Sequence, residues 1–311
     1  MAYLKSFGSA LPERVVTNDE LAARIGCEAA WILQMSGIVE RRWAASGESV
    51  VDLAVRAGED AIRCAGADRG QIKLALVSSG SAERRFPGPA AETAHRLGLG
   101  DIPAIDLPLA SAGSLVALAL ASRLAESVGD VLVIGAEKMS AVIDREPLDR
   151  NTAILFGDGA GAVWVSRDDG ALRVIDSALH TDGSFSESLR LEFGESITMD
   201  GRTVILQASR KMPAAIQEVL ERNSRRVEEV VAFLLHQANR NLTTRVAQAI
   251  GAPVERFVSN VERYGNTSSA SMLIAAAEWS VDAKVSVNEP VVFAAFGAGF
   301  QWGALLAAGA T

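Results

Sequence analysis

Histidine and cysteine are scarce in this 311-residue sequence, and their scarcity excludes two kinds of protein. The three histidines are His95, His180 and His236, too few for a metal site built from several imidazole ligands. We therefore expect no metal and no resident cofactor. The two cysteines, Cys27 and Cys64, cannot form the disulfide framework of a small secreted protein. A reducing compartment, the cytoplasm, is the expected location.

Long apolar runs and an excess of positive charge are missing as well. No stretch of 18 uninterrupted apolar residues occurs, so we expect no membrane span. The N-terminal residues lack the pattern of a secretory signal peptide. The net charge of −8 argues against a general nucleic-acid binder. With 49% hydrophobic residues, the chain can form one large α/β domain or two halves of about 150 residues each.

The sequence does contain alternating strand and helix patterns, and the alternation occurs twice. The first series has strands at 72–77, 102–107 and 131–134, helices at 90–99 and from 112, and a glycine-broken strand within 151–165. The second series has strands at 231–235, 257–258 and 291–296, helices at 242–250 and from about 268, and a glycine-broken segment at 297–303. This weak repeat predicts an α/β fold of two duplicated halves, residues 1–168 and 169–311.

Three polar residues follow the ends of predicted strands. Ser111 lies between an apolar strand and a long helix, while His236 and Asn266 each come just after a strand of the second half. In open α/β sheets, ligands bind beyond the carboxyl ends of the strands, so we expect these side chains to meet in one pocket. A residue at Ser111 would also lie at the positive end of a helix dipole, which suits a nucleophile or a developing anion.

Each of these features alone has a simpler explanation. Serine is a common helix N-cap, a buried histidine can bond to backbone, and an Asn-Thr-Ser-Ser stretch is typical of a turn. The glycines at 157–161 suggest a close approach of another backbone or a sharp bend. They do not match a dinucleotide fingerprint, because they lie inside a strand pattern and do not open a helix.

A series of motifs weighs against the simpler explanations. They are Trp31-Ile-x-x-x-Ser-Gly-Ile38 with Glu40-Arg-Arg42, Arg85-Phe-Pro87, Asp149-Arg150, Phe156-Gly-Asp-Gly-Ala-Gly161, His236-Gln-Ala-Asn239, Gly265-Asn-Thr-Ser268 and Phe296-Gly-Ala-Gly-Phe-x-Trp-Gly303. Over essentially its whole length the chain resembles β-ketoacyl-acyl carrier protein synthase III, the condensing enzyme that initiates fatty acid synthesis. This resemblance implies a thiolase-like, five-layered αβαβα fold, with the nucleophile in the first half and the histidine and asparagine in the second.

The resemblance also implies a role for each of the three residues. Where this chain has Ser111, the family carries a cysteine that accepts an acyl group from acyl-CoA. The residues matching His236 and Asn266 promote decarboxylation of a malonyl-carrier protein. The backbone N–H groups matching Ser111 and Ala298 form the oxyanion hole. Acyl-CoA and an acyl carrier protein are thus the implied partners.

A coenzyme A site and a homodimer are implied in the same way. Trp31 and Arg150 would sandwich the adenine by stacking and cation–π contact, with Gly201 and Asn239 further along the site. The alternative for Trp31 is a half-buried surface aromatic. Phe86 matches a residue that crosses the dimer interface to close the partner's acyl pocket. The alternative role for Phe86, that of a buried aromatic at an interface, implies a dimer too.

Some positions depart from the family pattern. Met35 stands where an arginine often stacks on the adenine, and Arg202 stands where asparagine is frequent. Asn241 replaces an arginine that docks the carrier protein, although Arg240 and Arg245 lie nearby and are candidates to replace it.

The serine at 111 leaves three functions open. Unlike a thiol, a serine hydroxyl does not ionise and needs a general base, and an acyl oxyester is less electrophilic than a thioester. The chain is therefore predicted to be an acyltransferase of the ketoacyl synthase III type that uses Ser111. The alternatives are Ser-dependent acyl transfer or thioester hydrolysis without condensation, and a non-catalytic subunit. The retained His236 and Asn266 favour an enzyme.

Overall fold

A computed structural model describes residues 1–143 and 148–310. The strands are β1 (Tyr3–Ala10), β2 (Arg14–Thr17), β3 (Glu40–Trp43), β4 (Ile72–Ser78), β5 (Ala104–Leu107), β6 (Asp130–Lys138), β7 (Asp158–Ser166), β8 (Leu172–Thr181), β9 (Leu189–Arg190), β10 (Thr198–Met199), β11 (Ala232–Leu235), β12 (Pro290–Gly297) and β13 (Gln301–Gly309). The α-helices are α1 (Asn18–Ile25), α2 (Ala29–Ser36), α3 (Val50–Ala65), α4 (Pro89–Arg96), α5 (Gly113–Val128), α6 (Ser140–Ile143), α7 (Arg150–Ala153), α8 (Gly201–Arg222), α9 (Arg240–Ile250), α10 (Val261–Tyr264) and α11 (Ser271–Asp282).

The two halves share one strand topology. In the first half the order is β1-β7-β6-β4-β5, with β4 parallel to its two neighbours and β7 antiparallel to its own. The second half repeats this as β8-β13-β12-β11, with a parallel bridge from Phe233 to Phe257 in place of a fifth strand. The halves join where β1 pairs with β8 over two residues. The predicted duplication of an α/β unit is therefore confirmed, while the division into residues 1–168 and 169–311 stays a prediction.

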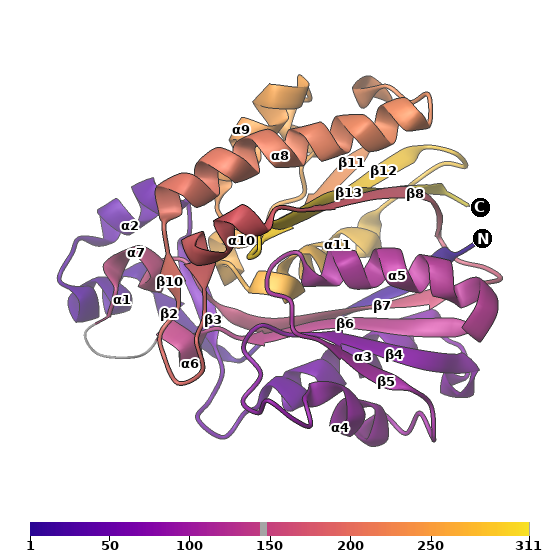
Figure 1. Cartoon of the computed structure of the whole chain (residues 1–311), viewed down its shortest axis with the longest axis horizontal. Coiled ribbons are helices and arrows are strands. Elements are labelled where there is room, and N and C mark those ends of the chain that lie inside the picture. The colour runs from indigo at the N-terminus through magenta and orange to yellow at the C-terminus, as the bar shows by residue number, and fades with distance from the viewer. Residues whose placement is uncertain (144–147, 311) are drawn as a thin grey trace.

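The elements stack in five layers, as Figure 1 shows. Helices α8 and α9 cover the outer face of the second half, and α3 and α4 cover that of the first. Helices α5 and α11 lie between the two sets of strands. Their buried faces, together with residues from both sets of strands, form a central apolar core. The αβαβα architecture implied by the resemblance is thus correct.

Local sequence accounts for how α3 begins and packs. Ser49 and Asp52 form a reciprocal capping box at its N-terminus, which satisfies backbone donors that the first turn leaves free. Its buried residues Leu53, Ala57 and Ala61 recur at helical spacing, and the helix packs on β1 and β7. The small residues allow a close approach, since a Cβ atom on Gly8 would lie 2.2 Å from the Ala61 nitrogen.

Three elements differ from the prediction. The strand expected within 151–165 begins only at Asp158, after the short helix α7. The sequence also predicts a helix from Met212 to Asn223, but α8 begins earlier, at Gly201, and continues through Pro213, whose neighbours are held by packing. The strand at 102–107 is the shorter edge strand β5 and is not fully buried. Within the described residues, no helix is long and apolar enough to cross a membrane.

Candidate active site

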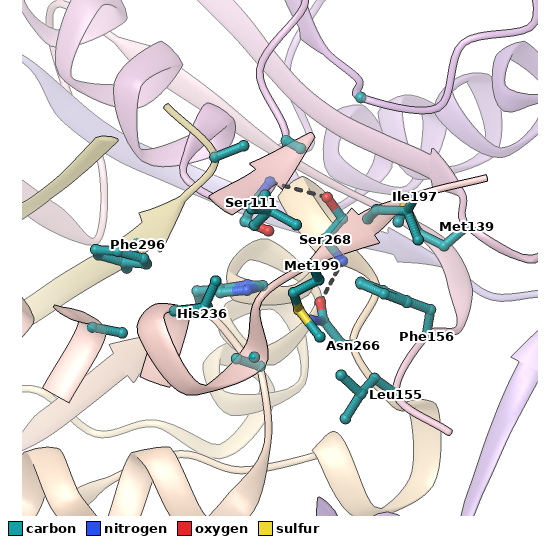
Figure 2. Close-up of a pocket in the computed structure, with 18 of the residues that line it drawn as sticks. Ser111, Met139, Leu155, Phe156, Ile197, Met199, His236, Asn266, Ser268 and Phe296 are labelled. Carbon is teal, nitrogen blue, oxygen red and sulfur yellow. Dashed lines mark hydrogen bonds between the residues drawn. The ribbon is translucent and has the colours of Figure 1, made fainter. Parts of the chain in front are cut away.

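Ser111, His236 and Asn266 line one cavity of about 900 Å³, part of which is open to solvent. Ser111 precedes α5, His236 follows β11, and Asn266 lies between α10 and α11. Figure 2 shows the three side chains around the same space. Most other lining residues are apolar and include Met139, Leu155, Phe156, Leu189, Leu191, Ile197, Met199, Val204, Ile205, Leu242 and Phe296. The fold thus brings the three residues together, as expected, and their catalytic roles stay predictions.

Ser111 does not serve as a helix cap. The N-cap position of α5 is Ala112, and Ser111 adopts φ 58°, in the left-handed region that serine rarely occupies. Close packing against the end of β12 holds it there. A Cβ atom on Gly297 would lie 2.5 Å from the Ala110 carbonyl oxygen and 2.7 Å from the Ala112 nitrogen. The strained serine, free of a capping role, is available for chemistry.

The predicted oxyanion hole contains an additional residue, Ser268. The Ser111 N–H donates to the Ser268 hydroxyl oxygen at 2.9 Å. Ala298, whose N–H is the second predicted donor, also lines the cavity. An acyl oxygen that uses the Ser111 N–H must therefore displace Ser268 or share the donor with it. Ser268 has a left-handed backbone too, with φ 48°.

His236 is buried, and the Ser271 hydroxyl favours one of its two neutral tautomers. Its Nδ1 atom lies 2.7 Å from the Ser271 hydroxyl oxygen, which already accepts the Gln237 N–H at 3.0 Å. The Ser271 proton is satisfied if it is donated to Nδ1, and this places the ring proton on Nε2. Burial lowers the pKa of His236 to about 4, against a smaller opposing hydrogen bond with the Ser268 backbone. The imidazole is neutral at pH 7.

Asn266 is oriented by its own loop. Its N–H donates to the Leu155 carbonyl at 2.8 Å, and its carbonyl accepts the Gly157 N–H at 3.1 Å. Its side-chain oxygen accepts the Ser268 N–H at 2.9 Å, so the amide Nδ2 group is the part left to donate into the cavity. Asn266 and the Nε2–H of His236 are two neutral donors suited to a developing enolate.

The side chains of Ser111 and His236 are not joined directly. Among the hydrogen bonds of the part of the chain that the structure describes, none connects them; the Ser111 backbone bonds to Ser268 and the His236 ring to Ser271. Neither Ser268 nor Ser271 was predicted to have a role at the site. The sequence feature that could have indicated them is the Asn-Thr-Ser-Ser-Ala-Ser stretch, which contains more serines than a turn requires.

The residues expected to bind coenzyme A fall into two groups. Gly201 and Asn239 line the cavity, and the Asn239 side chain also caps α9 by accepting the Leu242 N–H at 2.8 Å. Trp31 and Arg150 lie outside the lining, with the guanidinium 4.3 Å from the ring centroid. They already form a cation–π pair, so an adenine would have to enter between them.

The positions that depart from the family pattern lie on the surface near α2, α8 and α9. Met35 is 51% exposed. Asn241 donates to the carbonyl of Met35 at 3.1 Å and so ties α9 to α2. Arg202, Arg240 and Arg245 are exposed, with Arg240 3.9 Å from a carboxylate oxygen of Glu262.

Phe86 does not reach the cavity of its own chain. It is 84% exposed and lies in the loop before α4. A role in closing an acyl pocket would therefore require a second chain. Within residues 1–143 and 148–310, no group of three or more His, Cys, Asp or Glu side chains could hold a metal ion.

Comparison with known proteins gives concordant matches. Models of 3-oxoacyl-[acyl-carrier-protein] synthase III match residues 105–183 and, for its C-terminal part, 220–308. β-Ketoacyl-[acyl-carrier-protein] synthase III of Paramagnetospirillum magneticum is 36% identical over 96% of both chains. The crystal structure of the Aquifex aeolicus synthase III has a TM-score of 0.94 and 34% identity, and the match covers 99% of this chain and 100% of that one. The priming β-ketosynthase of the R1128 polyketide pathway has a TM-score of 0.92 and 32% identity, over 100% and 96%.

Proposed function

The chain belongs to the 3-oxoacyl-[acyl-carrier-protein] synthase III family, and from this premise we propose that it condenses an acyl group from acyl-CoA with a malonyl group on an acyl carrier protein. The observation that carries the proposal is the meeting of a serine hydroxyl and two neutral donors in one largely apolar cavity. A cavity of this kind can hold an acyl chain, with the nucleophile at one end of the chain and the enolate beside the nucleophile.

In the first step the Ser111 hydroxyl oxygen attacks the thioester carbonyl of acyl-CoA. The C–O bond forms, the C–S bond breaks, and coenzyme A leaves as its thiol with the hydroxyl proton. His236 can relay that proton only after its ring proton has moved to Nδ1, where the Ser271 hydroxyl now donates. Acyl transfer to serine is therefore expected to be slow compared with transfer to a thiol.

In the second step the malonyl group loses carbon dioxide. The electrons of the breaking C–C bond move onto the thioester carbonyl oxygen, which the Nε2–H of His236 and the amide of Asn266 stabilise. The carbanion then attacks the acyl carbonyl on Ser111. The ester C–O bond breaks, the Ser111 oxygen takes up a proton from solvent in place of the one that left with coenzyme A, and the 3-oxoacyl product remains on the carrier protein.

The enzyme would bind two partners and would act as a dimer. Coenzyme A would insert its adenine between Trp31 and Arg150, and the acidic carrier protein would dock on the exposed arginines Arg240 and Arg245. Phe86 would complete the acyl pocket of a second copy, which makes the enzyme a homodimer. The reaction needs no resident cofactor, and the cytoplasm is its proposed location.

Intact-mass measurement after incubation with acyl-CoAs of increasing chain length tests the function. The expected result is one added acyl group, absent in Ser111→Ala, and release of a 3-oxoacyl-carrier protein when malonyl-carrier protein is supplied. Free acid with turnover would instead identify a thioesterase. A protein that neither gains mass nor releases carbon dioxide from malonyl-carrier protein would be a non-catalytic member of the family.

A further inference from the structure

Glu137, near the end of β6, is a fully buried carboxylate to which the proposed reaction assigns no role. One of its oxygens accepts from the Ser269 hydroxyl at 2.7 Å and the Ser269 N–H at 3.2 Å. The other accepts from the Ser81 hydroxyl at 2.5 Å and the Ser79 hydroxyl at 3.3 Å. The Gly80 N–H lies 3.0 and 3.1 Å from the two oxygens. Glu137 thus joins one segment from each half of the fold.

The first of these segments, residues 78–81, supports the loop that carries Ser111. The Ser78 hydroxyl donates to the Leu109 carbonyl at 2.8 Å. A Cβ atom on Gly80 would lie 2.7 Å from the Ala110 Cβ atom, so the two backbones are in close contact. The hydrogen bonds from Ser79, Gly80 and Ser81 to Glu137 therefore hold in place the segment that packs against the Ser111 loop.

The second segment holds Ser111 from the other side. Ser269 directly follows Ser268, whose hydroxyl accepts the Ser111 N–H at 2.9 Å. Because Ser268 has a left-handed backbone, its position depends on neighbours that hold it there. Strand β6 packs against the same segment, since a Cβ atom on Gly135 would lie 2.6 Å from the Ser269 carbonyl oxygen.

We propose that Glu137 is a positioning residue that fixes Ser111 for acyl transfer while leaving the decarboxylating pair largely independent of it. The inference rests on the function proposed above. The independence follows from the anchors of the pair. Asn266 is held by backbone bonds to Leu155 and Gly157. His236 is held through the Ala294 carbonyl and the Ser271 hydroxyl. The Asn266 side-chain oxygen also accepts the N–H of Ser268, which precedes the Glu137-bound Ser269. The backbone bonds that hold Asn266 and His236, however, do not involve Glu137.

The first experiment tests whether Glu137 holds the Ser111 loop in place, and its readout does not depend on catalysis. Hydrogen–deuterium exchange of the peptide spanning residues 107–112 is compared in wild type, Glu137→Ala and Asp130→Ala. Asp130 is the matched control, because it is a buried carboxylate at the start of β6 that accepts from Trp164 and Arg167. We expect exchange about 10-fold faster or more in Glu137→Ala and unchanged in Asp130→Ala. Equal protection in both variants would overturn the inference.

The second experiment separates the two chemical steps. In Glu137→Ala we expect Ser111 acylation to fall about 10- to 100-fold, as small misplacements of a reacting group do. Release of carbon dioxide from malonyl-carrier protein should stay within about 3-fold of wild type, since its donors keep their anchors. Equal loss of both steps would indicate a merely structural role and would refute the inference.

Two further variants keep the test decisive if Glu137→Ala does not fold. Glu137→Gln retains an oxygen for Ser269 and presents its NH₂ group to the hydroxyls of Ser79 and Ser81, which can accept it, so it should recover most of the acylation. Ser269→Ala should reproduce the selective loss. If wild type is never acylated, the proposed function fails, while the exchange comparison still decides the role of Glu137.

Discussion

Ser111 stands where the resemblance implies a cysteine, and its surroundings show what such a thiol would gain. The N-terminus of α5 begins two residues later, at Gly113, and its dipole favours a negative charge. His236 does not help as a cation, because its pKa of about 4 makes it neutral at pH 7. Thiolate formation at this position would therefore depend on the helix.

The change Ser111→Cys should raise condensation strongly, by about 10-fold or more. A thiol near a helix N-terminus ionises in part without a general base, and the resulting thioester is a better acceptor for the enolate. The oxyanion hole would be unaffected, because its donors are backbone N–H groups, each typically worth roughly 3–4 kcal/mol. The assay uses acetyl-CoA and longer acyl-CoAs with malonyl-carrier protein. Ser111→Ala should lose acylation and keep decarboxylation. A cysteine variant that is neither acylated nor condensing would contradict the ketoacyl synthase assignment.

His236 should make the folded protein less stable in acid. Its pKa falls from 6.5 to about 4 on burial, so between these values the unfolded chain binds more protons than the native one and stability falls as the pH is lowered. The loss amounts to roughly 3 kcal/mol. Urea unfolding at several pH values measures this loss of stability, which should be absent in His236→Gln. Asp158 should act in the opposite sense, because burial raises its pKa to about 6. Parallel curves for wild type and His236→Gln would refute the prediction.

Among the elements, strand β7 shows why glycines interrupt an apolar strand. Gly161 faces α11 so closely that a Cβ atom would lie 2.6 Å from the Leu273 Cβ and 2.7 Å from the Ile274 nitrogen. Gly161→Ala should therefore destabilise the fold by about 1–3 kcal/mol, through overpacking of a buried contact. Thermal unfolding measures the loss. Gly47→Ala is the control, since nothing lies within 4 Å of its Cβ position. Equal melting temperatures for the two variants would be evidence against the close contact.

Strands and helices with clear periodicity could be predicted from the sequence, and so could the close approach at the glycines of β7. The start of α8 could not, because Pro213 is locally a helix breaker and only packing of the neighbouring Met212 and Ile216 overrides it. Because Ser111, His236 and Asn266 each follow a predicted strand, the sequence correctly indicated that they are neighbours. The contacts of Ser268 and Glu137 escaped prediction, because they depend on how the two halves dock, and no local pattern encodes that.

At the scale of the whole molecule, the candidate active site belongs to neither half alone. Ser111 comes from the first half, and His236 and Asn266 from the second. The bonds that cross between the halves include Ser111 to Ser268 and Glu137 to Ser269. Duplication of the fold therefore places Ser111 and Asn266 just before the two central helices α5 and α11, with His236 after β11. The buried polar bonds between the halves set the spacing of the three residues.

The edge strand β5 predicts how two copies of the chain associate. It ends the sheet order, its Ile105 is 46% exposed, and nearby loops expose Phe86 at 84% and Phe193 at 70%. An unprotected apolar edge favours pairing with another strand, and an obligate interface of this kind buries on the order of 2,000 Å² or more. We expect sedimentation velocity at micromolar concentration to give a dimer. Ile105→Lys should shift it toward monomer, whereas Val281→Lys, at an exposed site on α11, should not.

Phe86 links this interface to the chemistry. If its ring closes the acyl pocket of the partner chain, Phe86→Ala should alter the acyl-chain preference of Ser111 while the protein remains dimeric, because one aromatic contributes only part of a large interface. The measurement is the intact-mass panel of acyl-CoAs run beside sedimentation. A monomeric wild type would refute the dimer. A dimer whose acyl preference is unchanged in Phe86→Ala would leave Phe86 as an interface aromatic without a role at the pocket.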